Sequence, residues 1–306
     1  MSKDLVQLSG EPKIREYAQG RARDAVGEIA EFIAPTVETA THTGKFSKYD
    51  DSNRFKIPET LRELGGEATQ LQFRKTDEKF DAKPHALDCP LDNIEIDEAD
   101  GEDLLKENAD ESAALAGMSH ELRVIETALA NAPVDATKGT WSDPAVNPVK
   151  ELNQLISQVY LAAGGHPSIE VGIVIDPTSL IAFFSNPNTK GYFPGAESIA
   201  PNLDNMRQLL IGKTAAKTSW LAVDTAARGK SESMAFAMVN KVLIFARSTK
   251  PTRRDPSFMK TFRPRGRWMV PGVYEKVDGR GKVTKMDWSE DVQVSNLAAA
   301  KQIAID

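Results

Sequence analysis

The residues that could do chemistry are concentrated in two charged runs. The stretch from Asp88 to Glu111 carries eleven acidic residues against one basic residue, Lys106. Two of these carboxyl groups could act as a general acid and a general base. The run contains far more carboxylates than that chemistry needs, and the surplus would only repel. We therefore interpret it as a solvated or partner-facing surface.

The second run, 241–267, carries nine basic residues against one acidic residue, Asp255. Its aromatic residues could stack on bases, but their alternating spacing is more typical of buried strands. The formal net charge of −6 argues against a protein that coats nucleic acid. We expect the two runs to pair within or between subunits, with nucleic acid as the alternative partner of the basic run. The expected intersubunit contacts are Arg253, Arg254, Arg263, Arg265 and Arg267.

Motifs for enzyme, nucleotide and metal sites are incomplete. The stretch Gly212 to Thr214 resembles the end of a phosphate loop, but Arg207 stands where the first glycine of that loop belongs. The four histidines have no paired spacing that would suit a metal. The one cysteine, Cys89, has no nucleophile signature around it. The sequence predicts no enzyme, no catalytic residue, no cofactor and no metal site.

The composition is that of an ordinary globular protein. The chain has 306 residues, 41% hydrophobic and 27% charged, which suits one large domain or two moderate ones. A single cysteine cannot form an intrachain disulfide. No signal-peptide pattern and no apolar stretch of the length of a membrane span, about 18 residues, is present. We expect folding in a reducing cytoplasm and no membrane contact.

The first third of the chain predicts an arm. A helix is expected over 12–34, after an extended tail at 1–11. Threonines and aromatics favour strands at 36–49 and 68–87, on either side of the polar segment 50–66. A two-stranded ribbon is marginally stable alone in water, so we expect a neighbouring subunit to cover it. The expected contacts at its tip are Arg54, Lys56, Arg62 and Glu63.

A long helix is expected over 108–132, with Asn108 as its N-cap and Glu111 as the capping-box partner. Its apolar residues recur at spacings of three and four, which places them on one face. We expect this face to pack against the strands of 268–294. The residues of the stripe are Leu115, Met118, Leu122, Ile125 and Leu129.

The rest of the chain alternates between helices and strands. After a helix that begins at Asn147-Pro148, the apolar run 169–175 predicts a buried strand. Helices at 177–184 and 203–211 and strands at 220–223 and 234–245 complete a sheet layered by helices. Strands at 270–277 and 283–294 flank Asp278-Gly279, a hairpin turn signal. The fold class is α+β.

The order of these parts resembles the major capsid proteins of tailed phages with the Hong Kong 97-type fold. Segments that resemble relatives are Trp141-Ser142-Asp143-Pro144, Gly164-Gly165-His166-Pro167, Asp176-Pro177, Asp287-Trp288-Ser289-Glu290-Asp291 and Asn296-Leu297-Ala298-Ala299. The resemblance implies an N-terminal arm at 1–35, an extended loop at 36–90, a peripheral domain with a spine helix at 91–146, an axial domain at 147–246, and a return to the peripheral domain at 247–306.

The resemblance further implies a structural protein of the virion that assembles with itself. Pentamers and hexamers would form an icosahedral shell around phage double-stranded DNA, with the axial domain at the capsomer centre. Assembly would take place in the host bacterial cytoplasm. Because the folded body begins within about the first 35 residues, we expect a separate scaffolding protein, besides a portal and decoration proteins. The alternatives are the shell protein of a bacterial encapsulin compartment and a soluble acid/base enzyme that uses the carboxylates of 88–111.

Overall fold

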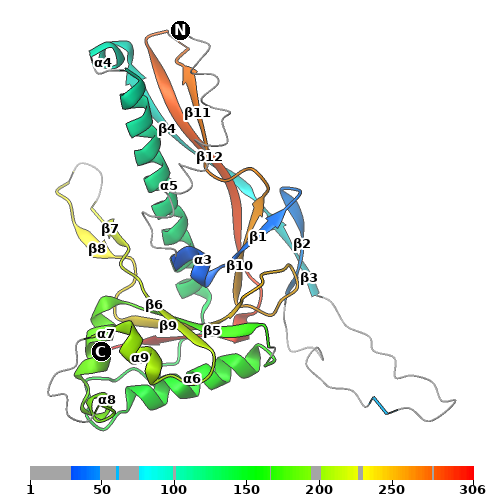
Figure 1. Ribbon diagram of the computed structural model, residues 1–306, viewed down its shortest axis with the longest axis vertical. Helices are drawn as coiled ribbons and strands as arrows, with labels where there is room; N and C mark the ends of the chain where they lie inside the picture. The colour runs from blue at the N-terminus through cyan, green and yellow to red at the C-terminus, as the bar shows by residue number, and fades with distance from the viewer. Residues whose placement is uncertain are drawn as a thin grey trace.

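The computed structural model of the chain describes residues 29–48, 60–61, 76–98, 101–165, 167–193, 201–226, 230–277 and 279–306. The described chain has two parts (Figure 1). One is an elongated half in which a long helix lies along an antiparallel sheet. The other is a compact half in which helices cover both faces of a four-stranded sheet.

The elongated half is built around one long strand. Its strands are β1 (Thr36–Thr39), β4 (Lys83–Asp92), β10 (Met259–Pro264), β11 (Val270–Glu275) and β12 (Gly281–Val294). β12 pairs with β4 over residues 281–290, with β11 over residues 282–287 and with β10 over residues 291–294. β1 joins the far side of β10 in parallel. Helix α5 (Gly101–Asn131) packs along β12 and β4, and the short helix α4 (Asn93–Glu98) stands at its distal end.

The base of the expected arm is a hairpin of β2 (Thr43–Lys48) and β3 (Thr76–Asp81). Phe80 stacks on Phe262 of β10 with ring centroids 4.4 Å apart, which ties this hairpin to the sheet. The expectation of one strand over 36–49 is wrong, because β1 pairs with β10 while β2 pairs with β3. The second expected strand also divides, since β4 leaves the hairpin and pairs with β12.

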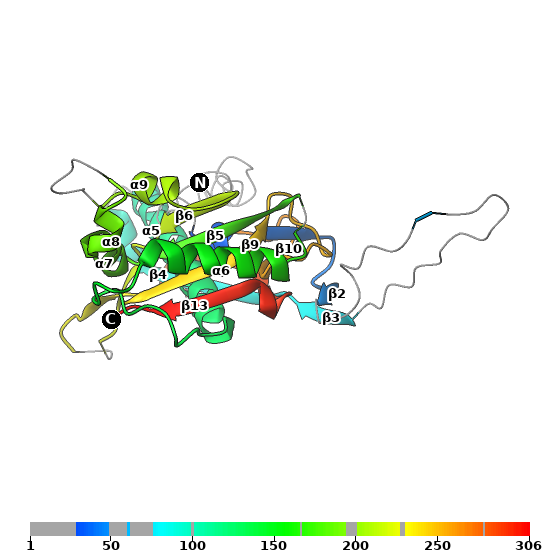
Figure 2. The ribbon, with the colours of Figure 1, turned by 90° about the horizontal axis from the view of Figure 1, so that it is seen from below.

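The sheet of the compact half has the order β13-β9-β5-β6. Its strands are β5 (Ile169–Ile175), β6 (Thr214–Thr218), β9 (Lys241–Ser248) and β13 (Ala300–Ala304). Alternate residues of β9 enter different cores: Val242 and Ile244 face α6 (Pro148–Ala162), whereas Leu243 and Phe245 face α3 (Ile29–Ile33) and α5. Burial on both faces explains why the central strands β5 and β9 contain continuous apolar runs. Figure 2 shows α6 lying across this sheet.

Two helices of the compact half begin where the sequence predicts. The Asn147 side chain accepts a hydrogen bond from the Lys150 amide at the start of α6. Asp176 does the same for Thr178 and Ser179 at the start of α7 (Pro177–Ser185). The remaining elements are α8 (Pro187–Lys190), α9 (Leu203–Gln208), β7 (Ala222–Asp224), β8 (Met234–Phe236) and the 3-10 helix η1 (Leu297–Ala299). The expected strand 234–245 is therefore two strands, β8 and β9.

Two expectations for the long helix are wrong. It begins at Gly101, so Asn108 is not its N-cap. Leu115 is 59% exposed, although Ile125 is buried as expected. In the N-terminal half of α5, two alanines, Ala113 and Ala116, pack on the elongated sheet against Met286 and Trp288. Small side chains let the helix approach these large ones, and a stripe defined by large apolar residues misses them.

Candidate functional site

The four residues expected at the tip of the arm, Arg54, Lys56, Arg62 and Glu63, lie outside the described residues. The structure therefore describes only the base of the arm. Their role as intersubunit contacts stays a prediction.

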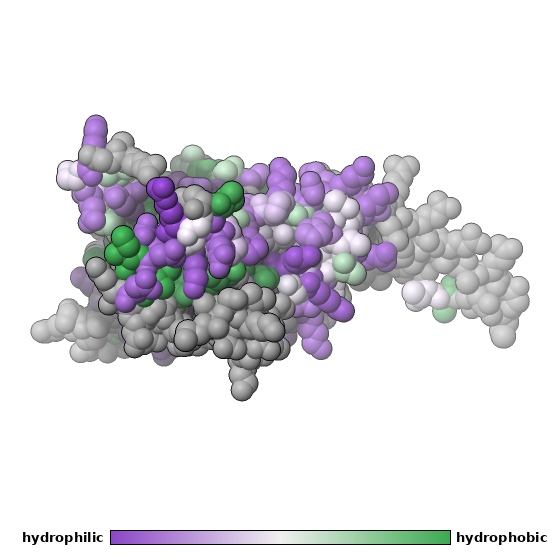
Figure 3. Space-filling view, turned by 90° about the horizontal axis from the view of Figure 1, so that it is seen from above, coloured by the Kyte–Doolittle hydropathy of each residue, from purple (hydrophilic) through white to green (hydrophobic). Residues whose placement is uncertain are grey.

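The acidic run extends over the end of β4, α4 and the first part of α5, and most of its described carboxylates are exposed. Two of them cap α4: Asp92 accepts from the Ile94 amide at 3.0 Å, and Glu95 accepts from the Asp92 amide at 3.0 Å. Asp88 accepts from the Tyr274 hydroxyl at 3.1 Å, which raises the pKa of that tyrosine. Figure 3 shows this end of the molecule, where hydrophilic residues predominate on the described part of the face. These carboxylates do not converge on one point.

The five arginines of the basic run have different environments. Arg253, Arg254, Arg265 and Arg267 are exposed. Arg265 lies 3.4 Å from Glu38, and the Arg253 guanidinium lies over the Phe80 ring. Arg263 is different, because its side chain is 10% exposed and its carboxylate partners belong to the same chain.

The expected aromatic core is confirmed for Phe258 and Phe262, which are fully buried. Within the subunit, Arg263 and Arg265 do not pair with the acidic run as expected. Their partners are Glu31, Glu38 and Glu290, all outside 88–111. Arg263 is thus a residue of the subunit interior, and only the four exposed arginines remain expected as intersubunit contacts.

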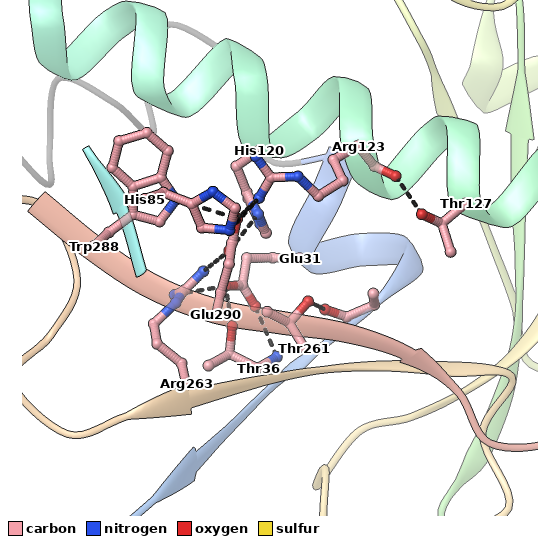
Figure 4. A network of polar contacts seen from close by, with 11 residues as sticks. Glu31, Thr36, His85, His120, Arg123, Thr127, Thr261, Arg263, Trp288 and Glu290 are labelled. Atoms are coloured by element: carbon pink, nitrogen blue, oxygen red, sulfur yellow. Dashed lines mark hydrogen bonds and ion pairs between the residues drawn. The ribbon is translucent and has the colours of Figure 1, made fainter. Parts of the chain in front are cut away.

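Arg263 belongs to a buried polar network between α5 and the elongated sheet, which Figure 4 shows. At its centre is the Glu290 carboxylate on β12, whose side chain is 1% exposed. Arg123 of α5 donates to Oε1, and the Trp288 indole donates to the same oxygen at 3.2 Å. Nδ1 of His120 lies 2.7 Å from Oε2. The helix therefore contacts β12 through two side chains one turn apart.

Arg263 extends the network to the N-terminal segment. Its Nη2 lies 3.6 Å from the Glu290 carboxylate and its Nη1 lies 3.5 Å from that of Glu31 on α3. The guanidinium stacks on the Trp268 ring at 3.4 Å from the centroid. Glu31 also accepts from the amide and hydroxyl of Thr36. One arginine thus joins α3, β1 and β12.

The electrostatics of the network favour an ionised Glu290. Burial alone would raise the pKa of this carboxyl, but His120, Arg263 and Arg123 together lower it to about 2. His85 of β4 closes the network on the solvent side, with Nε2 3.3 Å from Arg123 and its ring stacked on Trp288. Burial and the Arg123 charge lower the pKa of His85. These contacts hold α3, α5, β10 and β12 together. We call the side chains of Glu290, His120, Arg123 and Arg263 the Glu290 clamp.

A second buried cation lies in the same half. Lys260 of β10 donates to the Asp255 carbonyl at 2.7 Å and to the Ser295 hydroxyl at 3.1 Å. Burial lowers the pKa of this amine to about 8, although the nearby Asp255 carboxylate opposes the shift. Lys260 ties the loop before β10 to the end of β12, which is a structural role.

Sequence reasoning missed both clusters. It took His120 only as an isolated histidine and did not single out Glu31, Lys260 or Glu290 as partners. The network side chains come from segments far apart in the sequence, so no local spacing reveals them. One available signal was the position of His120 one turn from the alanines of the buried face of α5. Among the described residues, no group of three acidic, histidine or cysteine side chains could hold a metal ion, and no helix has the length and apolarity of a membrane span.

Comparison with known proteins identifies the fold. No family model matches the chain. The major capsid protein of Pseudomonas phage JBD67 is 29% identical over 141 residues, which cover 44% of this chain and 46% of that protein. The match therefore spans about half of the relative's length. The crystal structure of a phage-related protein from Bordetella bronchiseptica has a TM-score of 0.71 at 16% identity over 96% of both chains.

The similarity extends to solved capsids. The capsid of Myoviridae phage XM1 has a TM-score of 0.53 at 11% identity, over 89% of this chain and 90% of that chain. The chain has the Hong Kong 97-type capsid fold. An encapsulin complex from Synechococcus elongatus also has a TM-score of 0.53, at 10% identity over 88% of this chain and 84% of that chain. The capsid fold alone therefore does not separate a phage shell from an encapsulin.

Proposed function

We propose that the chain is the major capsid protein of a tailed phage. It assembles as pentamers and hexamers into an icosahedral shell around double-stranded DNA. The observation that carries the proposal is the sequence match to a phage major capsid protein, on a chain of which 89% also aligns with the solved capsid of phage XM1. The protein is a structural one, and its working surfaces are contacts between copies.

The shape of the described chain supports a shell subunit. The base of the β2–β3 hairpin is anchored on the subunit's own sheet by Phe46 and Phe80 against Phe262. Because a two-stranded ribbon is marginally stable alone in water, a neighbouring copy would cover the rest of the expected arm. The buried clamp on Glu290 holds α5, β10 and β12 in fixed positions, as a subunit that makes the same contacts many times requires.

The sequence match favours a phage over an encapsulin. The encapsulin and the XM1 capsid have equal TM-scores, but the 29% identical relative is a phage protein. The enzyme alternative depended on the carboxylates of 88–111. Those that the structure describes are spread over β4, α4 and α5: two of them cap α4, Asp88 accepts from Tyr274, and most are exposed.

The proposal includes partners and a location. Besides itself, the chain would meet a separate scaffolding protein, a portal and decoration proteins, with DNA in the lumen. It would reside in the virion capsid after assembly in the host cytoplasm. The compact half would lie at the capsomer centre, since its exposed loops are suited to contacts around a ring.

Expression of the chain in a bacterial host, followed by size-exclusion chromatography and negative-stain electron microscopy, tests this function. Shells, or ring-shaped pentamers and hexamers, are the expected products. Particles from infected cells should contain double-stranded DNA. Particles filled with a cargo enzyme would instead identify an encapsulin. A stable monomer or dimer at every concentration, with and without the scaffolding protein, would exclude both kinds of shell.

A further inference from the structure

Glu121 is a buried acid on α5 that the Glu290 network does not use. The residue is 1% exposed and follows His120, so the two side chains point to different sides of the helix. The backbone amides of Ile29 and Ala30, at the start of α3, donate to its carboxyl group. Its Oε2 is buried and has no hydrogen-bond partner in the described part of the chain. Glu121 therefore holds the first turn of α3 and retains one unused oxygen.

Helix α3 depends on such contacts. It has five residues, and helices this short are not stable alone. Phe32 packs edge-on against Phe245 at 5.5 Å, with the Arg247 guanidinium 4.6 Å from its ring centroid. Glu31 on the same helix reaches Arg263. The attachment of α3 to the rest of the subunit is therefore the sum of these contacts and of the Glu121 contact.

The surroundings of Glu121 make its ionisation costly. Burial raises the pKa of its carboxyl to about 7, although the amides of Ala30 and Ile29 and the charge of Lys217 oppose the shift. Lys217 is thus the cation that acts on it. The described charged side chains with contacts beside α3 and Glu121 are Lys217 on β6 and Arg247 on β9, both over the Phe32 ring, Glu170 on β5 beside Arg247, Glu31 on α3, and His120 and Arg123 on α5.

Most of these neighbours already have other partners. Arg247 lies 3.0 Å from Glu170, and His120 and Arg123 contact Glu290. They do not neutralise an ionised Glu121. A buried oxygen without a hydrogen-bond partner and a charge that Lys217 and the α3 amides offset only in part make the contact with α3 sensitive to protonation.

We propose that Glu121 is a pH-dependent latch for α3: α3 stays closed over the neutral carboxyl, and ionisation loosens it because a buried carboxylate regains hydration when α3 opens, which outweighs its stronger hydrogen bonds from the α3 amides. The device controls how firmly residues 29–33 are attached to the rest of the described subunit. It would let a change of pH around neutrality alter that attachment without disturbing the Glu290 clamp.

Linkage gives the direction and size of the effect. When α3 opens, Glu121 meets water and its pKa returns toward 4.5, so the open state binds fewer protons than the closed state. Opening is therefore favoured as the pH rises. Between pH 6 and pH 8 the open fraction of α3 should increase about 10-fold, and it should change little above pH 8.

Hydrogen–deuterium exchange of the full-length protein measures this opening. Exchange rates of the amides of 29–33 are recorded from pH 6 to pH 8 and corrected for the intrinsic pH dependence of exchange. The expected result for the wild type is about a 10-fold loss of protection, while amides of the buried strand β5 keep theirs. Constant or rising protection of 29–33 with pH would overturn the proposal.

Two variants separate the titration of Glu121 from that of other groups. Glu121→Gln keeps the shape without the titration, so protection of 29–33 should be high and independent of pH. Glu126→Gln, on the exposed face of α5, is the matched control and should behave as the wild type. If Glu121→Gln folds and still loses protection about 10-fold, another group such as His120 is responsible and the latch is refuted. If Glu121→Gln does not fold, the wild-type and Glu126→Gln profiles still show whether the protection of 29–33 falls with rising pH, and constant protection refutes the latch.

Discussion

The Glu290 clamp gives the sharpest prediction for stability. Replacement by glutamine preserves the volume of the side chain and leaves an oxygen for the Trp288 indole, but removes the charge that faces Arg123, His120 and Arg263. A fall of the Glu290 pKa from 4.5 to about 2 corresponds to about 3 kcal/mol of folding free energy at neutral pH. Breaking a buried ion pair commonly costs about 3–5 kcal/mol. Glu290→Gln should therefore lower the free energy of unfolding by about 3 kcal/mol.

The pH dependence follows from the same shift. Because the folded-state pKa of Glu290 is lowered, its contribution is fully present above pH 4.5 and is lost as the pH falls toward 2. Urea unfolding of the unassembled protein at fixed concentration, between pH 7 and pH 3, measures both effects. The wild type should lose this contribution on acidification and Glu290→Gln should not. A decrease below about 1 kcal/mol at pH 7, equal to that of Glu126→Gln, would show that the network does not stabilise the subunit.

Three further predictions concern the spine helix, the arm and the basic run. Ile125→Ala should cost about 2–5 kcal/mol in urea unfolding, whereas Leu115→Ala should change stability by less than about 0.5 kcal/mol; equal effects would contradict the observed orientation of α5. Deletion of 50–66 should leave a folded subunit that forms no shells, and normal shells in electron micrographs would end that claim. Replacement of Arg253, Arg265 and Arg267 by serine should weaken assembly and reduce its salt dependence, as light scattering would record; unchanged salt dependence would exclude a role of these charges.

The compact half was largely predictable because its signals are local. Helices α6 and α7 begin at Pro148 and Pro177 as expected, and the side chains of Asn147 and Asp176 cap them. The run 169–175 is a buried strand. Its neighbouring residues Ile173 and Val174 enter the cores on opposite faces of the sheet, so neither face of the strand has to be polar. Hydrophobic period and capping residues depend on neighbours within a few positions, so a sequence displays them directly.

The elongated half was predictable in outline but not in its contacts. The parallel pairing of β1 with β10 joins segments more than 200 residues apart, and no turn signal links them. His120 and Glu121 are polar residues on a helix, which pattern analysis assigns to solvent, yet both are buried. Each is buried because a partner from a distant segment, Glu290 or the α3 amides, compensates part of the cost. Such compensation is a property of the fold and leaves no periodic mark in the sequence.

Cryo-electron microscopy of the assembled protein tests the central claim most directly. The account predicts closed icosahedral shells in which copies of this chain form pentamers and hexamers. The compact half should surround the rotation axes, and the β2–β3 arm should lie over a neighbouring subunit. Particles without pentamers and hexamers, or shells in which the compact half lies far from the axes while the arm folds back on its own subunit, would contradict the account.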